Sequence, residues 1–147
     1  ILTNRMNTDN MQKMGGIRNV SRTFSVLFLI IIFGSIAIPL TNGFVGEFLL
    51  LHGIFQYNTV MAVFSSLTVI LGTLYLMRAY HKIMHGETNT LTETFGTITL
   101  NEKIILAGFV VLILFFGIFP NIMLQVSEPQ VKQLIEHVHH ALAMAKH

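Results

Sequence analysis

The stretch from Ile38 to Phe48, IPLTNGFVGEF, places an ionisable glutamate inside the most apolar part of the sequence. A charged side chain within a membrane costs about 3 kcal/mol or more and is a functional candidate by default. Desolvation favours the neutral acid of Glu47, whereas a nearby helix N-terminus favours its carboxylate, and such opposing effects suit a group that exchanges protons. We predict that Glu47 is a proton-relay residue. The alternative is a neutral or salt-bridged glutamate that only fixes helix packing.

The same stretch carries residues that interrupt a helix. Pro39 lacks a backbone N–H, and its ring clashes with the preceding turn. Thr41 and Asn42 are good N-caps for a second helix that starts near Gly43, a residue that permits unusual backbone angles. Because non-helical backbone survives at membrane depth only when it is buried in protein or lines a wet cavity, we predict a helix, a break and a second helix. Ion-coupled transporters use this arrangement repeatedly.

Histidine is the other residue type here that exchanges protons readily. His52 follows Glu47 by five residues, which corresponds to about 140° around a helix, so the two side chains do not share a face. His52 is therefore a second, weaker candidate for the relay. No metal site is predicted. Other histidines, expected at the lipid–water boundary or in the tail, are His81, His85, His137, His139 and His140.

The composition places these residues in a membrane protein. Of 147 residues, 52% are hydrophobic and only 11% are charged, whereas a soluble domain carries about 25% charged residues. The chain has no cysteine, which excludes disulfides and thiolate-bound iron–sulfur clusters from it. The sequence pI of about 9.2 reflects a small excess of lysine and arginine. In a membrane protein we interpret this excess as informing the orientation in the membrane rather than as a sign of nucleic-acid binding. Because the sequence opens with Ile1, we expect it to be part of a longer protein.

Three apolar regions alternate with polar ones. A spanning helix needs roughly 20 apolar residues, and residues 59–83 and 104–126 each provide such a run. As one helix, residues 24–57 would be about 50 Å long, against a hydrocarbon core of about 30 Å, so this region is either one broken span or a hairpin. The predicted parts are a polar inner segment (1–23), a broken transmembrane helix (24–57), a transmembrane helix (59–83), a polar loop (84–103), a transmembrane helix (104–126) and an amphipathic tail (127–147).

The distribution of lysine and arginine decides between one span and a hairpin. With one broken span, seven basic residues share one side and two lie on the other, whereas a hairpin gives six against three. The positive-inside rule favours the first arrangement. We therefore predict an all-α, polytopic membrane bundle with three crossings, the first of them discontinuous, and with the C-terminus on the outer side.

The tail after the last crossing has the pattern of an amphipathic helix. Ser127 and Gln130 have the spacing of a capping box, and Pro129 would fall in the first turn, where its missing N–H does no harm. We predict a helix from Ser127 that lies along the outer surface, with its apolar stripe against lipid or a neighbouring subunit.

The motif around Glu47 resembles the signature of the antiporter-like, proton-pumping subunit M (mitochondrial chain 4) of respiratory complex I, the NADH:quinone oxidoreductase. Ile38 and Pro39, followed by GFVGEF, carry the likeness, and related antiporter-like chains usually have lysine where Glu47 stands. The family usually has glycine where Leu40 stands. Further stretches that are similar to the family, in the right order, are NRMNTDNMQKMGGI, GTLYLMRAYHKIMHG, LNEKIIL and GIFPNIML.

This resemblance implies the C-terminal part of such a subunit, in which Glu47 is the distal member of a chain of ionisable residues next to the proton outlet. It implies proton translocation coupled to NADH oxidation and quinone reduction, with NADH, flavin, iron–sulfur clusters and quinone on other subunits and none on this chain. The expected partners are other membrane-arm subunits of complex I and the lipid bilayer, with no nucleic acid. The expected location is the bacterial inner membrane or the mitochondrial inner membrane. The alternative is an antiporter-like subunit of a cation/proton antiporter or of a membrane-bound hydrogenase.

Overall fold

A computed structural model of the chain describes residues 1–8, 10–11 and 14–144, with side chains as far as residue 138. Throughout these residues the regular secondary structure is helical, which confirms the predicted all-α class. The helices are α1 (Leu2–Met6), α2 (Ile17–Val20), α3 (Arg22–Ser35), α4 (Asn42–Tyr57), α5 (Thr59–Met84), α6 (Thr90–Phe95), α7 (Leu100–Ile118) and α8 (Asn121–Met144).

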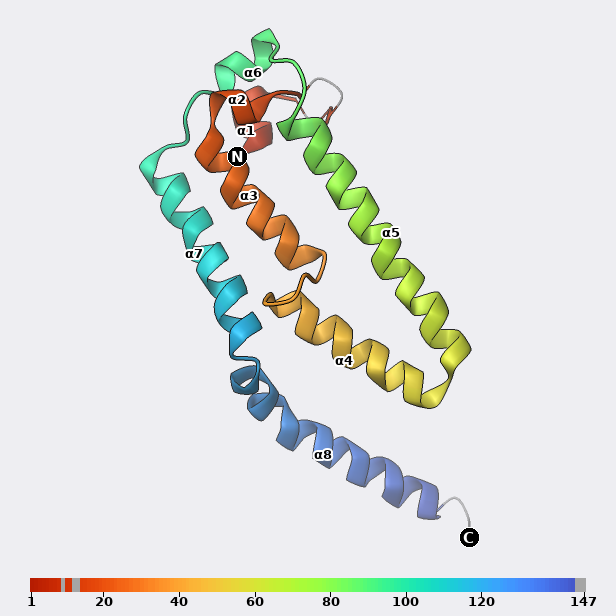
Figure 1. Cartoon of the computed structure of the whole chain (residues 1–147). Helices are drawn as coiled ribbons and strands as arrows, with labels where there is room; N and C mark the ends of the chain where they lie inside the picture. Colours follow the sequence, from red (N-terminus) through yellow and green to blue (C-terminus); the bar gives the residue numbers. More distant parts are fainter. Residues whose placement is uncertain (9, 12–13, 145–147) are drawn as a thin grey trace.

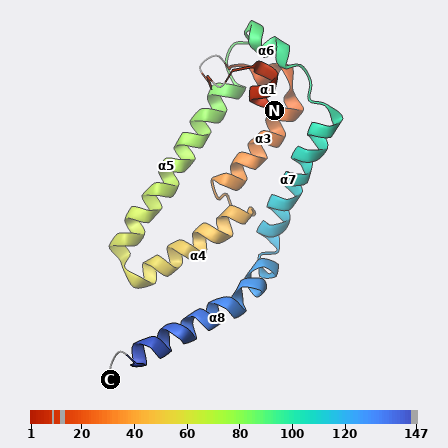
Figure 2. The ribbon, with the colours of Figure 1, turned by 180° about the vertical axis from the view of Figure 1, so that it is seen from behind.

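The long helices run back and forth between two ends of the molecule (Figure 1). α3 leads into α4, and α5 then returns along both of them, because Asn58 makes a sharp turn and accepts hydrogen bonds from the first amides of α5, Val60 N–H at 2.9 Å and Met61 N–H at 3.2 Å. α7 runs in the opposite direction to α5 and contacts α3 and α4, as the view from behind also shows (Figure 2). α8 extends from the end of α7, away from the end that holds α1, α2 and α6.

We call the segments 1–21 and 85–99 together the polar end. Most of the buried core lies in this end or directly beneath it, where α1, α2 and α6 pack over the adjoining ends of α3 and α5. Phe24 is its centre: its ring lies 5.6 Å from that of Phe28 and 5.1 Å from that of Phe95, measured between centroids. Short amphipathic helices with large apolar side chains thus close one end of the bundle.

The rest of the bundle turns its apolar side chains outward. α5 and α7 are long and apolar enough to cross a membrane, and only 6% of the most apolar stretch of α5 is buried within the chain. α3 is apolar but shorter, and α4 has no fully buried residue. Such a surface requires lipid or further protein around it, because contiguous apolar patches of this size are rare on soluble monomers.

Two boundaries differ from those predicted. The apolar run 104–126 is not one helix, because α7 ends at Ile118 and α8 begins at Asn121. Pro120 explains the interruption, since it cannot donate the hydrogen bond that would continue α7. Its carbonyl instead accepts the first bonds of α8, from Met123 N–H at 3.0 Å and Leu124 N–H at 3.1 Å.

The predicted capping box at Ser127 is wrong for the same reason. Since α8 has already begun at Asn121, Ser127 lies inside it, and its hydroxyl donates back to the carbonyl of Met123 at 2.9 Å instead of accepting from Gln130. Pro129 is likewise inside α8 rather than in a first turn. The helix continues through Pro129 with one backbone hydrogen bond fewer.

Candidate functional site

The segment between α3 and α4 holds the residues predicted to break a helix. Pro39 lies within the turn, Thr41 is the N-cap of α4, and Asn42 and Gly43 are the first two residues of that helix. The hydroxyl of Thr41 does not accept from the first turn of α4, as an N-cap hydroxyl would. It donates to the carbonyl of Ile38 at 2.6 Å, and the Thr41 amide donates to the same oxygen at 3.1 Å.

Close backbone packing shapes this turn. Ala37 and Leu40 adopt positive φ angles of 53° and 78°, a region that favours glycine. α7 supports the turn from outside, because a Cβ atom on Gly117 would overlap the carbonyl group of Leu40. A Cβ atom on Gly43 would overlap the carbonyl oxygen of Gly34 in the same way. The two glycines therefore allow α7, α3 and α4 to meet backbone to backbone at the turn.

Glu47 stands on α4, one turn beyond this close contact, and faces a groove of about 370 Å³ between α3, α4 and α5. Its atom Oε2 is buried and has no hydrogen-bond donor within the described residues. The hydroxyl-bearing residues that line the groove are Ser35 of α3 and Ser65, Thr68 and Thr73 of α5.

The unpaired oxygen of Glu47 has chemical consequences. A buried acceptor without a donor costs about 1–3 kcal/mol, more when it is charged, so a water molecule that donates to this oxygen is favoured there. Three of the lining hydroxyls donate to carbonyls of their own helix: Ser35 to Ile31 at 3.3 Å, Thr68 to Phe64 at 3.4 Å and Thr73 to Val69 at 2.9 Å. Their lone pairs remain available to water. The groove can therefore hold a water chain that reaches Glu47.

His52, the second predicted relay residue, is not brought to Glu47. Its ring is exposed, stacks on Phe48 with centroids 6.3 Å apart, and has Nε2 3.1 Å from Nε2 of Gln56. It lines a separate hollow with residues of the first turns of α5, such as Ala62 and Val63. The helical spacing of about 140° accounts for this separation. Within the described residues, no three His, Asp or Glu side chains gather as a metal site; His139 and His140 lie beyond the described side chains.

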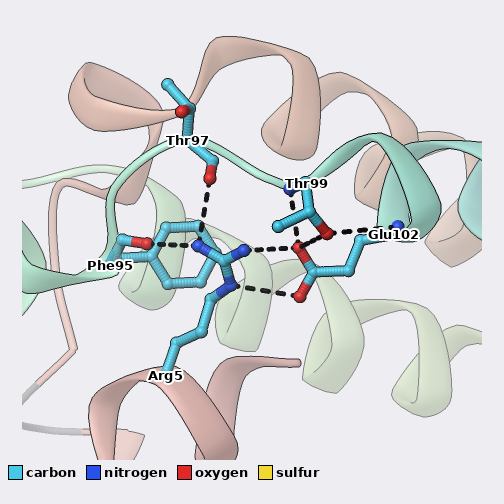
Figure 3. Close-up of polar contacts among 5 residues, drawn as sticks. All are labelled: Arg5, Phe95, Thr97, Thr99 and Glu102. Carbon is cyan, nitrogen blue, oxygen red and sulfur yellow. Dashed lines mark hydrogen bonds and ion pairs between the residues drawn. The ribbon is translucent and has the colours of Figure 1, made fainter.

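A second polar cluster, at the polar end, was missed by sequence reasoning (Figure 3). Arg5 donates from Nε to Oε1 of Glu102 at 3.1 Å and from Nη2 to Oε2, while Nη1 donates to the carbonyls of Phe95 at 2.7 Å and Thr97 at 3.0 Å. The guanidinium also lies 5.4 Å from the centre of the Phe95 ring. Glu102 accepts in addition from the amide and hydroxyl of Thr99, both at 2.8 Å. The Glu102 amide in turn donates to the Thr99 hydroxyl at 3.5 Å, which completes a capping box at the start of α7.

One half of this cluster has a signal in the sequence. Thr99 and Glu102 stand three apart immediately before an apolar run, which is the capping-box pattern. The other half has none, because Arg5 meets Glu102 across 97 positions of sequence. With both carboxylate oxygens of Glu102 engaged, this cluster ties α1 to α7 and leaves no free group for proton exchange.

The sequence of the chain is similar to known proteins over most of its length. Residues 1–73 match the family described as "NADH:quinone oxidoreductase/Mrp antiporter, TM". Over 135 residues, 91% of the chain, it is 38% identical to NADH-quinone oxidoreductase subunit M of Rickettsia prowazekii (strain Madrid E), of which it covers 28%. It is 33% identical over 140 residues to subunit M of Rhodobacter capsulatus, with 95% of the chain and 27% of that protein covered. It is 30% identical over 138 residues to NADH-ubiquinone oxidoreductase chain 4 of Marchantia polymorpha, with 92% of the chain and 28% of that protein covered. The chain thus spans a little over a quarter of the length of these curated relatives.

Proposed function

The chain belongs to the NADH:quinone oxidoreductase/Mrp antiporter family of membrane subunits, and from that premise we propose that it translocates protons through Glu47 as part of subunit M of an NADH:quinone oxidoreductase. The proposal goes beyond the similarity itself, because the relatives are named as subunits of the enzyme and the chain matches only part of each.

The observation that carries the proposal is the buried, unpaired Oε2 of Glu47 in a groove lined by hydroxyl groups. A structural glutamate in a low-dielectric site is normally matched by donors, because an unmatched carboxylate is costly. A relay residue needs the opposite, since the atom that takes up the proton must be reachable by water. The adjacent turn with Pro39 brings non-helical backbone close to the groove, as in the broken helices of transporters.

We extend the proposal to the orientation in the membrane. α3 and α4 together form one discontinuous crossing, and α5 and α7 are the second and third. The support comes from length: α5 has 26 residues, about 39 Å at 1.5 Å per residue, and it contacts both α3 and α4 on its return. Seven of the nine lysine and arginine residues lie in the polar end or within a few residues of it, and this excess supports an orientation with that end on the cytoplasmic or matrix side and α8 on the outer side.

In this proposal the chain supplies part of the ion path, and redox chemistry takes place elsewhere. NADH, flavin, iron–sulfur clusters and quinone belong to other subunits, in keeping with a chain that has no cysteine to ligate a cluster. The partners are the other membrane-arm subunits of the complex, and the location is a bacterial or mitochondrial inner membrane. A cation/proton antiporter or a membrane-bound hydrogenase is the alternative host. The relatives are subunits of NADH-quinone or NADH-ubiquinone oxidoreductases, which favours the oxidoreductase.

Substitution of Glu47 tests the function directly. Glu47→Gln in the intact complex keeps the shape of the side chain but cannot exchange a proton, so we expect proton pumping and coupled quinone reduction to fall while the amount of assembled complex is unchanged. Pumping is measured with a pH-sensitive dye in sealed vesicles, and assembly is measured on native gels.

The matched control is Glu128→Gln. This substitution makes the same chemical change far from the groove, at a side chain on α8 that is 57% exposed. Glu128→Gln is expected to pump like the parent. Parental pumping by assembled Glu47→Gln complex would refute the relay.

A further inference from the structure

Another hollow, of about 370 Å³, lies between α2, α3 and α5 at the polar end. Two helical stripes face each other across it. Arg22, Val26 and Leu29 follow helical spacing on α3, and Met77, His81 and His85 follow it along α5 and its C-cap. On both sides the basic residues stand nearest the polar end and the apolar residues stand one or two turns farther along, so the hollow has a basic mouth and an apolar wall.

The mouth holds donors that the protein does not satisfy. Nη1 of Arg18 lies 3.0 Å from Nε2 of His85, and since a guanidinium only donates, Nε2 must accept. Because Nε2 accepts, the ring carries its proton on Nδ1, and burial, His81 and Arg18 lower the pKa of His85, which favours the same neutral form. Among the described residues, that buried Nδ1–H has no acceptor, and the exposed side chain of Arg22 has neither a hydrogen bond nor an ion pair.

The other polar groups of the hollow are already paired. The hydroxyls of Ser25 and Tyr80 lie 2.9 Å apart and bond to each other. The lining includes no acidic residue to balance Arg18 and Arg22. The unmet requirement at the mouth is therefore for an anion with several acceptor oxygens, which matches the chemistry of a phosphate group.

We propose that this hollow binds an anionic phospholipid, with the phosphate at Arg18, Arg22 and His85 and an acyl chain along Val26, Leu29 and Met77. The apolar wall selects a lipid over a free phosphate ion, because a free ion would leave that wall without a partner. Basic pockets between transmembrane helices on the cytoplasmic or matrix side bind anionic headgroups. The proposal rests on the orientation given under the proposed function, which places the polar end at the inner leaflet.

Photolabelling of the intact complex in nanodiscs tests the site. The discs contain a trace of phosphatidylglycerol or of phosphatidylcholine, each with a photoreactive group in its acyl chain, and mass spectrometry locates the label. We expect phosphatidylglycerol to label Val26, Leu29 or Met77 more than phosphatidylcholine does. Each arginine near an anionic headgroup contributes about fivefold in affinity, so Arg22→Gln lowers the labelling about fivefold and Arg18→Gln with Arg22→Gln lowers it further.

Lys82→Gln is the control, since Lys82 is an exposed cation on the same turns of α5 but does not line the hollow. It is expected to keep parental labelling. Equal labelling by the two lipids, unchanged labelling in Arg22→Gln, or no labelling of the hollow by either lipid would overturn the proposal. Displacement of the label by excess inorganic phosphate would show that the hollow is a site for small anions and would overturn the proposal that it binds a lipid. Labelling is read without turnover, so its failure leaves the test of Glu47 unaffected.

Discussion

Near the polar end, Glu102 accepts hydrogen bonds from Arg5 and Thr99, and both of its oxygens are engaged. In the groove beside α4, by contrast, one oxygen of Glu47 has no donor among the described residues. The two glutamates are held by different means. Side-chain hydrogen bonds fix the region around Glu102, and close backbone packing fixes the turn beside Glu47. The difference shows how one chain can hold one carboxylate with donors on both oxygens and leave an oxygen of another carboxylate without a donor.

Gly117→Ala is the strongest way to break the packed region. A Cβ atom there overlaps the backbone carbonyl of Leu40, which cannot rotate away as a side chain would. Overpacking of this kind costs about 1–3 kcal/mol. We expect lower thermal stability of the complex and faster hydrogen exchange in residues 36–41. Gly108→Ala is the matched control on α7, because nothing lies within 4 Å of its added methyl and alanine favours the helix. Equal losses in both variants would show that backbone packing at the turn is unimportant.

Arg5→Ala is the corresponding test of the hydrogen-bonded region around Glu102. It removes the four bonds that Arg5 donates to Glu102, Phe95 and Thr97. We expect amide hydrogen exchange in residues 95–102 to rise about tenfold, the equivalent of one or two net hydrogen bonds. Arg5→Lys should recover only part of the protection, because an ammonium group lacks the planar fork. Unchanged exchange in Arg5→Ala would contradict the account, as would full recovery by Arg5→Lys.

Thr99→Ala isolates the cap of α7 from the arginine. Losing a threonine N-cap costs about 1 kcal/mol, and we expect that loss as fraying of the first turn of α7 in hydrogen exchange. Ser127→Ala provides the comparison, since the Ser127 hydroxyl donates to its own helix and caps nothing. A change within about 0.5 kcal/mol is expected there. If the two variants behave alike, the capping box contributes nothing in the assembled protein.

Lys132→Ala extends the comparison to a third glutamate, Glu128, by removing its partner. Glu128 and Lys132 form an i,i+4 pair at 2.6 Å on α8, with both side chains more than half exposed. Exposed pairs of this type contribute about 0.3–0.5 kcal/mol. We expect the smallest effect of the series, and one that disappears at high salt, as measured by helix protection in hydrogen exchange. A loss as large as that in Arg5→Ala would show that this surface is covered in the complex.

The sequence by itself determined the helical class, two apolar spans and the family. Composition and periodicity are local properties, and in lipid the backbone polar groups of a spanning segment must be satisfied within the protein. Glu47 stood out for the same reason, since an ionisable residue in an apolar run is visible without coordinates. The separation of His52 from Glu47 also followed from helical spacing alone. At Ser127 the local pattern misled, because Pro120 had already started the helix in which Ser127 lies.

Only the tertiary structure decided what each charged group meets. Arg5 and Glu102 become partners across 97 positions of sequence, and Arg18 meets His85 across 67. The backbone contact of Gly117 with Leu40 likewise depends on how α7 crosses the turn. No local pattern encodes these distances, because they arise when helices far apart in the chain pack together. The same holds for Glu47, whose Oε2 has no donor among the described residues. The sequence shows that a glutamate is present, but only the packing decides whether its oxygens have donors.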